Sequence, residues 1–167
     1  MKLDVLNHLS SKEAQEEFLK CCGSKRWAEA MTQSRPFKNP AELFDKAQRT
    51  WYYLTPEDWV EAFSQHPKIG DLDSLRIKFG ATKIWAKKEQ SGVALASEKV
   101  LTELAEGNQL YEKKFGYIFI VCATGKNAEE MLSVLKQRLQ NDPETEMRIA
   151  ADEQNKITRL RLERVLK

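Results

Sequence analysis

The chain contains two histidines, and their sequence surroundings differ. His8 precedes a predicted helix near the N-terminus, where a histidine is ordinarily solvated. His66 begins the sequence His66-Pro67-Lys68-Ile69-Gly70-Asp71, in which the proline fixes the backbone and the glycine allows a close turn. Imidazole suits proton transfer near neutral pH, and catalytic side chains concentrate in loops held by rigid elements. His66 is therefore the candidate acid–base group. The alternative, a structural histidine that caps a helix or bonds a loop carbonyl, stays open.

The pair Glu89-Gln90 lies close to the end of a predicted helix. A carboxylate near a helix C-terminus opposes the helix macrodipole, so Glu89 gains nothing from its local position. Such a placement suits a functional carboxylate. It equally suits a solvated helix end, because Lys87 and Lys88 stand beside it.

Arg161 is the third candidate and lies on the last predicted helix. Ala150, Gln154, Ile157 and Arg161 follow a 4-3-4 spacing and therefore share one helix face. On that face an arginine either snorkels to solvent or points into a pocket, where its guanidinium can hold an anionic group through paired hydrogen bonds.

Other chemistries lack their motifs in this sequence. It has no His-Glu-x-x-His, no Cys-x-x-Cys and no glycine-rich phosphate loop, so it offers no metal or phosphate site of these kinds. Cys21, Cys22 and Cys122 stand in helical or apolar surroundings, which are typical of buried, unreactive thiols.

The elements that position these residues are predicted from capping signals. Ser10 and Glu13 form a capping-box pattern, while Asn39-Pro40 and Thr55-Pro56 each place proline at a helix start. The predicted helices cover about 14–22, 24–33, 40–54, 56–63, 82–91, 97–115, 128–140 and 143 to near the C-terminus. The tryptophans are expected in the core: Trp27, Trp51, Trp59 and Trp85. We expect an all-α, single-domain helical bundle of about seven to nine helices over residues 1–167.

One segment departs from this helical pattern. Tyr117–Ala123 is rich in aromatic and β-branched residues, which favour a strand. No second strand-like run exists to pair with it, so we expect a buried extended segment or a strained helical turn. Buried backbone outside a ladder needs other hydrogen-bond partners, and a ligand can be one of them.

Composition restricts the partner and the compartment. The 27 basic and 25 acidic residues are mixed along the chain, unlike the concentrated basic face of a nucleic-acid binder. The longest apolar run, Tyr117–Ala123, is too short to span a bilayer, and acidic Asp4 comes too early for a signal peptide. We expect a cytoplasmic protein that binds a small molecule or another protein, with no nucleic acid and no membrane.

Four motifs occur in an order that resembles a known family. They are His66-Pro67-Lys68-Ile69-Gly70, Glu89-Gln90, the run from Phe115 to Val121, and Ile157–Leu162. In this order they resemble the 2-oxo-4-hydroxy-4-carboxy-5-ureidoimidazoline (OHCU) decarboxylases, over nearly the whole chain. The resemblance implies an all-helical fold, commonly a homodimer, that uses no metal or organic cofactor. It implies the last step of urate conversion to (S)-allantoin, with OHCU as the small-molecule substrate.

The resemblance also implies roles for individual residues. His66 would be the catalytic acid or base, and Glu89 its orienting or second proton-handling group. Arg161 would hold anionic or ureido oxygens of the substrate. The remaining residues would contact the substrate, the last three of them through backbone N–H and C=O groups: Pro67, Gln90, Phe119, Ile120 and Val121.

One position departs from the family pattern. The family often carries serine three residues before the glutamate, where this chain has Ala86. A hydroxyl contact is therefore missing, and a lyase or hydrolase acting on a related ureide stays an alternative. A non-catalytic helical interaction domain is the alternative from another class, and it predicts exposed apolar stripes without an enclosed pocket.

Overall fold

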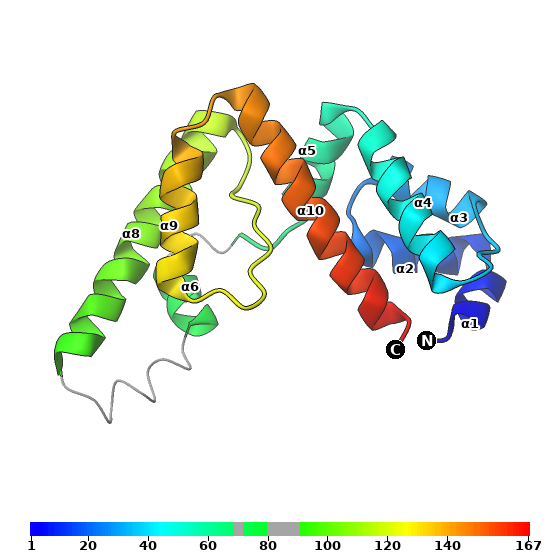
Figure 1. The fold of residues 1–167 in the computed structure, drawn as a ribbon, viewed down its shortest axis with the longest axis horizontal. Helices are drawn as coiled ribbons and strands as arrows, with labels where there is room; N and C mark the ends of the chain where they lie inside the picture. The colour runs from blue at the N-terminus through cyan, green and yellow to red at the C-terminus, as the bar shows by residue number, and fades with distance from the viewer. Residues whose placement is uncertain (69–71, 80–90) are drawn as a thin grey trace. The chain divides into compact units, whose positions relative to one another are not determined.

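The computed structural model describes the backbone of residues 1–68, 72–79 and 91–167, and the side chains of these except at 77, 78 and 91–97. This part of the chain is helical and contains no β-strand (Figure 1). Its helices are α1 (Leu3–His8), α2 (Ser11–Cys21), α3 (Lys25–Gln33), α4 (Pro40–Tyr53), α5 (Pro56–Ser64), α6 (Leu72–Lys78), α8 (Ser91–Phe115), α9 (Ala128–Leu139) and α10 (Pro143–Val165). The predicted all-α class is confirmed. None of the described helices has the length and apolarity needed to cross a membrane.

Side chains at the predicted capping positions start several of these helices. The backbone N–H of Glu13 donates to Ser10 Oγ at 3.3 Å, and the N–H of Ser10 donates to Glu13 Oε2 at 3.0 Å. Asn127 and Glu130 form the same reciprocal pair at α9, and Asn39 caps α4. These bonds satisfy N–H groups that have no partner inside the helix. Local sequence therefore determines where these helices begin.

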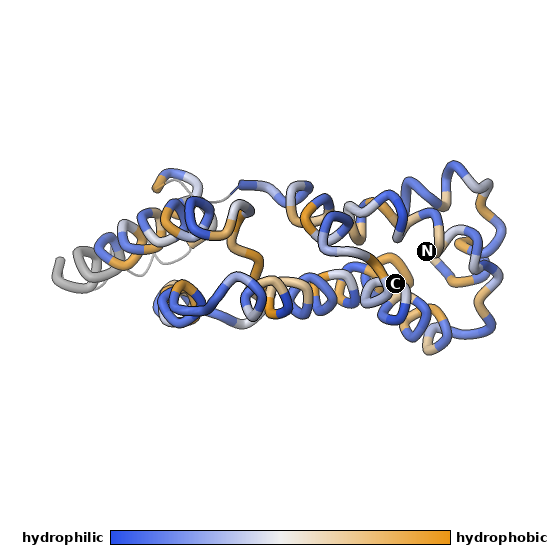
Figure 2. The backbone as a smooth tube through the Cα atoms, turned by 90° about the horizontal axis from the view of Figure 1, so that it is seen from above, coloured by the Kyte–Doolittle hydropathy of each residue, from blue (hydrophilic) through white to orange (hydrophobic). Residues whose placement is uncertain are grey.

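The first compact unit comprises Met1–His66, Ile120–Cys122 and Met147–Lys167. Trp51 on α4 is 1% exposed, and its indole N–H donates to the carbonyl oxygen of Ala151 on α10 at 2.9 Å. A buried indole that keeps a hydrogen-bond partner contributes its apolar area without an unsatisfied donor. Hydrophobic and hydrophilic residues alternate along the helical turns, as expected for amphipathic helices that pack on one face (Figure 2).

The second compact unit comprises Pro67–Phe119 and Ala123–Glu146. Within it, α8 and α9 lie side by side and run in the same direction (Figure 1). The two helices approach closely at Gly107, where an added Cβ would lie 2.6 Å from Leu135 Cδ2. An alanine at this position would therefore force the side chain of Leu135 to shift.

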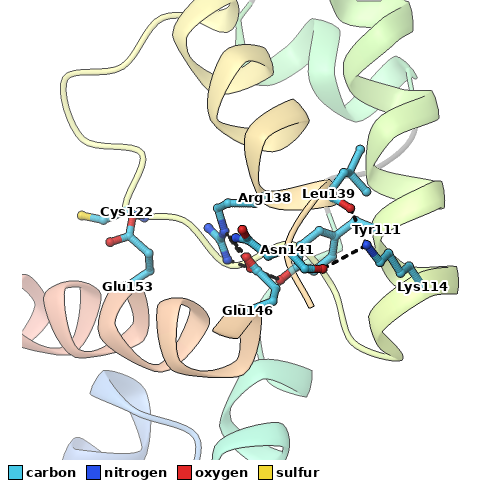
Figure 3. A network of polar contacts seen from close by, with 8 residues as sticks. All are labelled: Tyr111, Lys114, Cys122, Arg138, Leu139, Asn141, Glu146 and Glu153. Atoms are coloured by element: carbon cyan, nitrogen blue, oxygen red, sulfur yellow. Dashed lines mark hydrogen bonds and ion pairs between the residues drawn. The ribbon is translucent and has the colours of Figure 1, made fainter. Parts of the chain in front are cut away.

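A buried ion pair joins α9 to the first turn of α10 in this unit (Figure 3). Arg138 Nε donates to the two carboxylate oxygens of Glu146 at 2.7 and 2.9 Å, and the side chains are 6% and 0% exposed. The hydroxyl of Tyr111 donates to the same carboxylate at 3.1 Å, and the guanidinium lies 4.6 Å from the ring centroid of Phe119. Each charge in this cluster is compensated inside the unit.

The strand-like segment Tyr117–Ala123 is neither helix nor strand in the structure. Tyr117 and Ile120 are buried, at 8% and 2% exposed, and the other five residues are partly exposed, so the segment departs from helix as predicted and is buried in part. Two parallel helices need a connection that returns along them, and the 12 residues of α9 extend for about 18 Å. Extended backbone, at about 3.3 Å per residue, covers that distance with few residues.

Several helix boundaries differ from the prediction. The short helices α1 and α6 were not expected, and α1 has no side-chain cap that could have indicated it. Gly92 was expected to end a helix, yet α8 begins at Ser91 and continues through it. Glycine inside a helix costs about 1 kcal/mol relative to alanine, which a long helix tolerates. Residues 82–90 of the helix predicted before Gly92 lie outside the described residues.

Candidate active site

His66 lies just beyond α5, where the helix ends. Its backbone N–H donates to the carbonyl oxygen of Phe63 at 3.2 Å, which continues the last turn of the helix. The imidazole is half-buried, and its Nε2 lies 2.5 Å from Oε1 of Gln154 on α10. The backbone is therefore held by α5 and the ring by α10.

The surroundings of His66 favour the neutral imidazole. Burial lowers the pKa of His66 below its ordinary value, the hydrogen bond to Gln154 acts in the opposite direction, and the positive charge of Arg161 lowers the pKa again. The net shift is downward. An imidazole that is uncharged at neutral pH is ready to accept a proton, so His66 is suited to act first as a base.

Arg161 reaches from α10 to the C-terminal end of α2. Its Nη1 lies 3.5 Å from the carbonyl oxygen of Lys20 and 3.4 Å from that of Cys21. Carbonyl groups at a helix C-terminus carry partial negative charge and attract a cation. A guanidinium has five N–H donors, so Arg161 can bind these carbonyls and an anionic group as well.

A cavity of about 540 Å³ brings His66 and Arg161 together. Its volume is within the range of small-molecule sites. The lining residues come from α2, α3, α5, α10 and the turns beside them: Leu19, Lys20, Gly23, Lys25, Glu61, Ala62, Gln65, His66 and Arg161. Basic side chains outnumber the single carboxylate in this lining, so the cavity favours a small anionic ligand.

Two more of the predicted site residues, Ile120 and Val121, belong to the same compact unit as His66. The next residue, Cys122, donates its backbone N–H to Glu153 Oε1 at 3.2 Å, which fastens this extended stretch to α10 (Figure 3). Glu153 is 9% exposed. The backbone expected to read a substrate is thus held by a carboxylate on the helix that also holds the ring of His66.

The remaining predicted site residues are distributed differently. Pro67 and Phe119 belong to the second compact unit. Glu89 and Gln90 lie outside the described residues, as does Ala86. Phe119 packs against the ring of Tyr111, with the ring centroids 5.2 Å apart.

Sequence reasoning missed the partner of His66. The 4-3-4 spacing places Gln154 on the face of Arg161, but nothing in that spacing points to a histidine 88 residues earlier in the chain. It also missed Glu153, because a glutamate on a charged helix is ordinarily read as solvated. Only the fold reveals that both side chains face inward.

Cys21, Cys22 and His8 behave as expected from the sequence, whereas Cys122 is only partly buried. Burial raises the pKa of the Cys21 thiol to about 12 and that of Cys22 to about 11, so both are poor nucleophiles. The side chain of His8 is 78% exposed. Across the described part of the chain, no group of three or more His, Cys, Asp or Glu side chains gathers where it could hold a metal ion.

The fold is all-helical, and its cavity brings a half-buried histidine and an arginine together, an arrangement suited to acid–base chemistry on a small molecule. The chain belongs to the OHCU decarboxylase family, which matches residues 7–163.

Curated relatives and solved structures agree with this family. The uric acid degradation bifunctional protein TTL of Arabidopsis thaliana is 42% identical over 149 residues, which are 89% of this chain and 46% of the relative. The OHCU decarboxylase of Amia calva is 30% identical over 142 residues, 83% of this chain and 79% of the relative. The chain spans less than half the length of the bifunctional relatives it matches.

The fold also matches solved structures. A crystal structure of OHCU decarboxylase in the presence of (S)-allantoin is 41% identical, with a TM-score of 0.73 over 90% of this chain and 97% of that one. A crystal structure of (S)-allantoin synthase shares the fold, with a TM-score of 0.70 at 17% identity, over 100% of this chain and 54% of that one.

Proposed function

We propose that this chain catalyses the stereospecific decarboxylation of OHCU to (S)-allantoin and CO2, the last step in converting urate to allantoin. The observation that carries the proposal is the cavity shared by His66 and Arg161, in a chain that belongs to the OHCU decarboxylase family. The solved relative crystallised in the presence of (S)-allantoin supports the same substrate class. An anionic heterocycle suits a cavity whose charged lining is mainly basic.

The reaction needs one carbon–carbon bond broken, one proton moved from the hydroxyl to carbon 5, and one proton taken up from solvent. The name of the substrate places carboxylate and hydroxyl on ring carbon 4 and the ureido group on ring carbon 5. Loss of CO2 breaks the bond from carbon 4 to the carboxylate, and the electron pair moves through the ring onto a ring nitrogen, which takes up the proton from solvent. Removal of the hydroxyl proton and delivery of a proton to carbon 5 then leave a carbonyl at carbon 4. The face of proton delivery determines the S configuration.

His66 is the group we assign to this proton handling. Its lowered pKa keeps it able to accept the hydroxyl proton at neutral pH, and the resulting imidazolium can deliver a proton to the ring. Arg161 would bind the carboxylate or the ureido oxygens through paired hydrogen bonds. Preorganised donors of this kind stabilise the charge that develops as CO2 leaves.

The other assigned residues complete the proposed site. Glu89 acts with His66 as an orienting or second proton-handling group. Pro67 and Gln90 contact the substrate, while Phe119, Ile120 and Val121 offer backbone N–H and C=O groups to the amides of the ring.

We further propose that residues 1–167 act as one domain in a cytoplasmic homodimer. The family match runs through both compact units without interruption, which supports a single functional domain. The three cysteines are free thiols, as is usual in a reducing compartment.

The function is tested with substrate made in situ by urate oxidase and hydroxyisourate hydrolase in excess. Circular dichroism then follows the formation of (S)-allantoin. The proposal predicts rapid appearance of the S enantiomer at a rate proportional to the concentration of this chain. Slow, racemic allantoin at every concentration would overturn the proposed function, and turnover of allantoin or allantoate instead would favour a hydrolase or lyase acting on a related ureide.

A further inference from the structure

One buried side chain beside the candidate site has no part in the proposed chemistry. Gln154 is 0% exposed, and its amide oxygen Oε1 lies 2.5 Å from His66 Nε2. Its amide nitrogen donates to the hydroxyl oxygen of Thr158, one turn further along α10, at 3.0 Å. A buried amide with partners at both ends has its orientation fixed by the network around it.

The two ends of the Gln154 side chain face different partners. The amide nitrogen can only donate a hydrogen bond, and it faces the hydroxyl oxygen of Thr158. The amide oxygen faces Nε2 of His66.

An amide oxygen only accepts hydrogen bonds, so the proton must be on Nε2 of His66. In the neutral imidazole only one nitrogen carries a proton, which leaves a lone pair on Nδ1. Nε2 is occupied by Gln154. Any group that exchanges a proton with the neutral ring, a substrate hydroxyl included, must do so at Nδ1.

We propose that Gln154 is a positioning residue that holds His66 in the Nε2–H tautomer and so makes Nδ1 the base of the reaction. The inference deepens the proposed function and rests on it for the identity of the proton that is moved. The tautomer itself is a property of the resting protein and can be measured without substrate. Partners that orient a metal-bound histidine without touching the metal are typically worth 10- to 100-fold in activity, and we expect a similar range for Gln154.

Charged groups from each element around the cavity line it together with the ring of His66. They are Lys20 from α2, Lys25 from α3, Glu61 from α5 and Arg161 from α10. Variants at Gln154 leave all four unchanged, so a shift in the titration of His66 can be attributed to the amide.

The experiment is nitrogen-15 NMR of the imidazole rings, with kinetics on the same variants. The chain has only His8 and His66, so the variant His8→Gln assigns both signals. The full-length protein is expected to show His66 protonated on Nε2 and unprotonated on Nδ1 at neutral pH. A resting ring protonated on Nδ1 would overturn the proposal.

Substitutions at Gln154 separate positioning from packing. Gln154→Leu removes the acceptor and is expected to yield a mixture of tautomers, with kcat lowered about 10- to 100-fold and KM little changed. Gln154→Glu keeps an acceptor and adds a charge, so it should retain the Nε2–H tautomer, recover part of kcat and move the acid limb of the pH profile to higher pH. An unchanged tautomer and an unchanged kcat in Gln154→Leu would contradict the proposal.

Thr158 provides the matched control should Gln154→Leu fail to fold. Thr158→Ser keeps the hydroxyl and should preserve both the tautomer and kcat. Thr158→Val removes the hydroxyl and should yield a mixture of tautomers and a lower kcat. Equal behaviour of these two variants would overturn the assigned direction of the bonds. Failure of the proposed function is distinguishable from these outcomes, because a chain without decarboxylase activity would still display its resting tautomer.

Discussion

The two compact units each contain a buried polar network, and the networks differ in one respect. In the second unit Arg138, Glu146 and Tyr111 satisfy one another, with both members of the ion pair nearly inaccessible (Figure 3). In the first unit the hydrogen-bonded chain from Gln154 ends on His66, which lines a cavity with Arg161. The network of the first unit is open to a ligand, and the network of the second unit is closed.

This difference separates groups that do chemistry from groups that hold the fold. A closed network has no capacity left for a ligand, so removing one member leaves an uncompensated buried charge. An open network has its framework inside the protein and its reactive group at a cavity wall. Buried polar residues alone do not indicate a site; a partly accessible end of the network does.

The strongest test of this comparison breaks the closed network. Arg138→Met leaves Glu146 buried without its partner, and loss of one member of a buried pair typically costs about 3–5 kcal/mol. We expect the free energy of unfolding to fall by about that amount in urea titrations.

The exposed pair of Arg49 and Asp45 supplies the control for that variant. Arg49→Met should leave the unfolding midpoint almost unchanged, because exposed ion pairs contribute little. Adding Glu146→Leu to Arg138→Met should recover much of the loss. If Arg138→Met were as stable as wild type, the closed network would have no structural role.

A second variant removes the cation of the open network. Arg161→Gln should lower kcat/KM by about 10- to 100-fold, since a hydrogen bond to a charged group is worth about 1.5–3 kcal/mol. Its effect on unfolding should be small, because its contacts with the carbonyls of α2 are long. Arg159→Gln, on the same helix and largely exposed, is the matched control and should behave as wild type. Equal kinetics for the two variants would remove Arg161 from the site.

A third variant acts on the backbone next to Cys122, which we propose contacts the substrate. Glu153→Ala removes the acceptor for the Cys122 N–H, and we expect KM to rise several-fold, in line with about 1 kcal/mol for one hydrogen bond. Glu153→Gln keeps an acceptor and should recover most of the loss. Steady-state kinetics of the pair distinguish the hydrogen bond from the charge. A KM unaffected by either change would argue against a substrate-reading role for this backbone.

The smallest expected effect is a pH dependence of stability. The folded pKa of His66 is lowered below its unfolded value of about 6.5, so the unfolded chain takes up a proton that the folded ring resists. The stabilising contribution of the neutral ring is present above that unfolded value and is lost as pH falls through the folded pKa. The wild type should therefore lose more stability than His66→Asn between pH 7 and pH 5. If the difference in the free energy of unfolding between wild type and His66→Asn were the same at pH 7 and at pH 5, the lowered pKa would be contradicted.

The features of this structure that can be predicted from the sequence are those determined by residues close together in the chain. Capping pairs such as Ser10 with Glu13 act over three residues, and they predicted helix starts correctly. The strand-like composition of Tyr117–Ala123 likewise predicted that this run is not helical. Its structural reason, the return between two parallel helices, depends on the packing of α8 with α9.

The parts that could not be predicted depend on contacts between distant positions. Gln154 meets His66 across 88 residues, and Tyr111 meets Glu146 across 35. A charged or amide side chain on a helix is solvated by default, and only the fold determines which ones are buried. Spacing identified the face of α10 that carries Gln154 and Arg161. Only the structure shows that Gln154 contacts His66.

The central claim is that His66, held neutral by its surroundings, is the base of a decarboxylase. The most direct measurement is the pH dependence of kcat/KM for (S)-allantoin formation, followed by circular dichroism, in wild type and in His66→Asn. The account predicts an acid limb with its midpoint below pH 6.5 in wild type, and a 100- to 10,000-fold lower rate in the variant, as expected on removal of an acid–base catalyst. Full acceleration by His66→Asn with the same acid limb would contradict it.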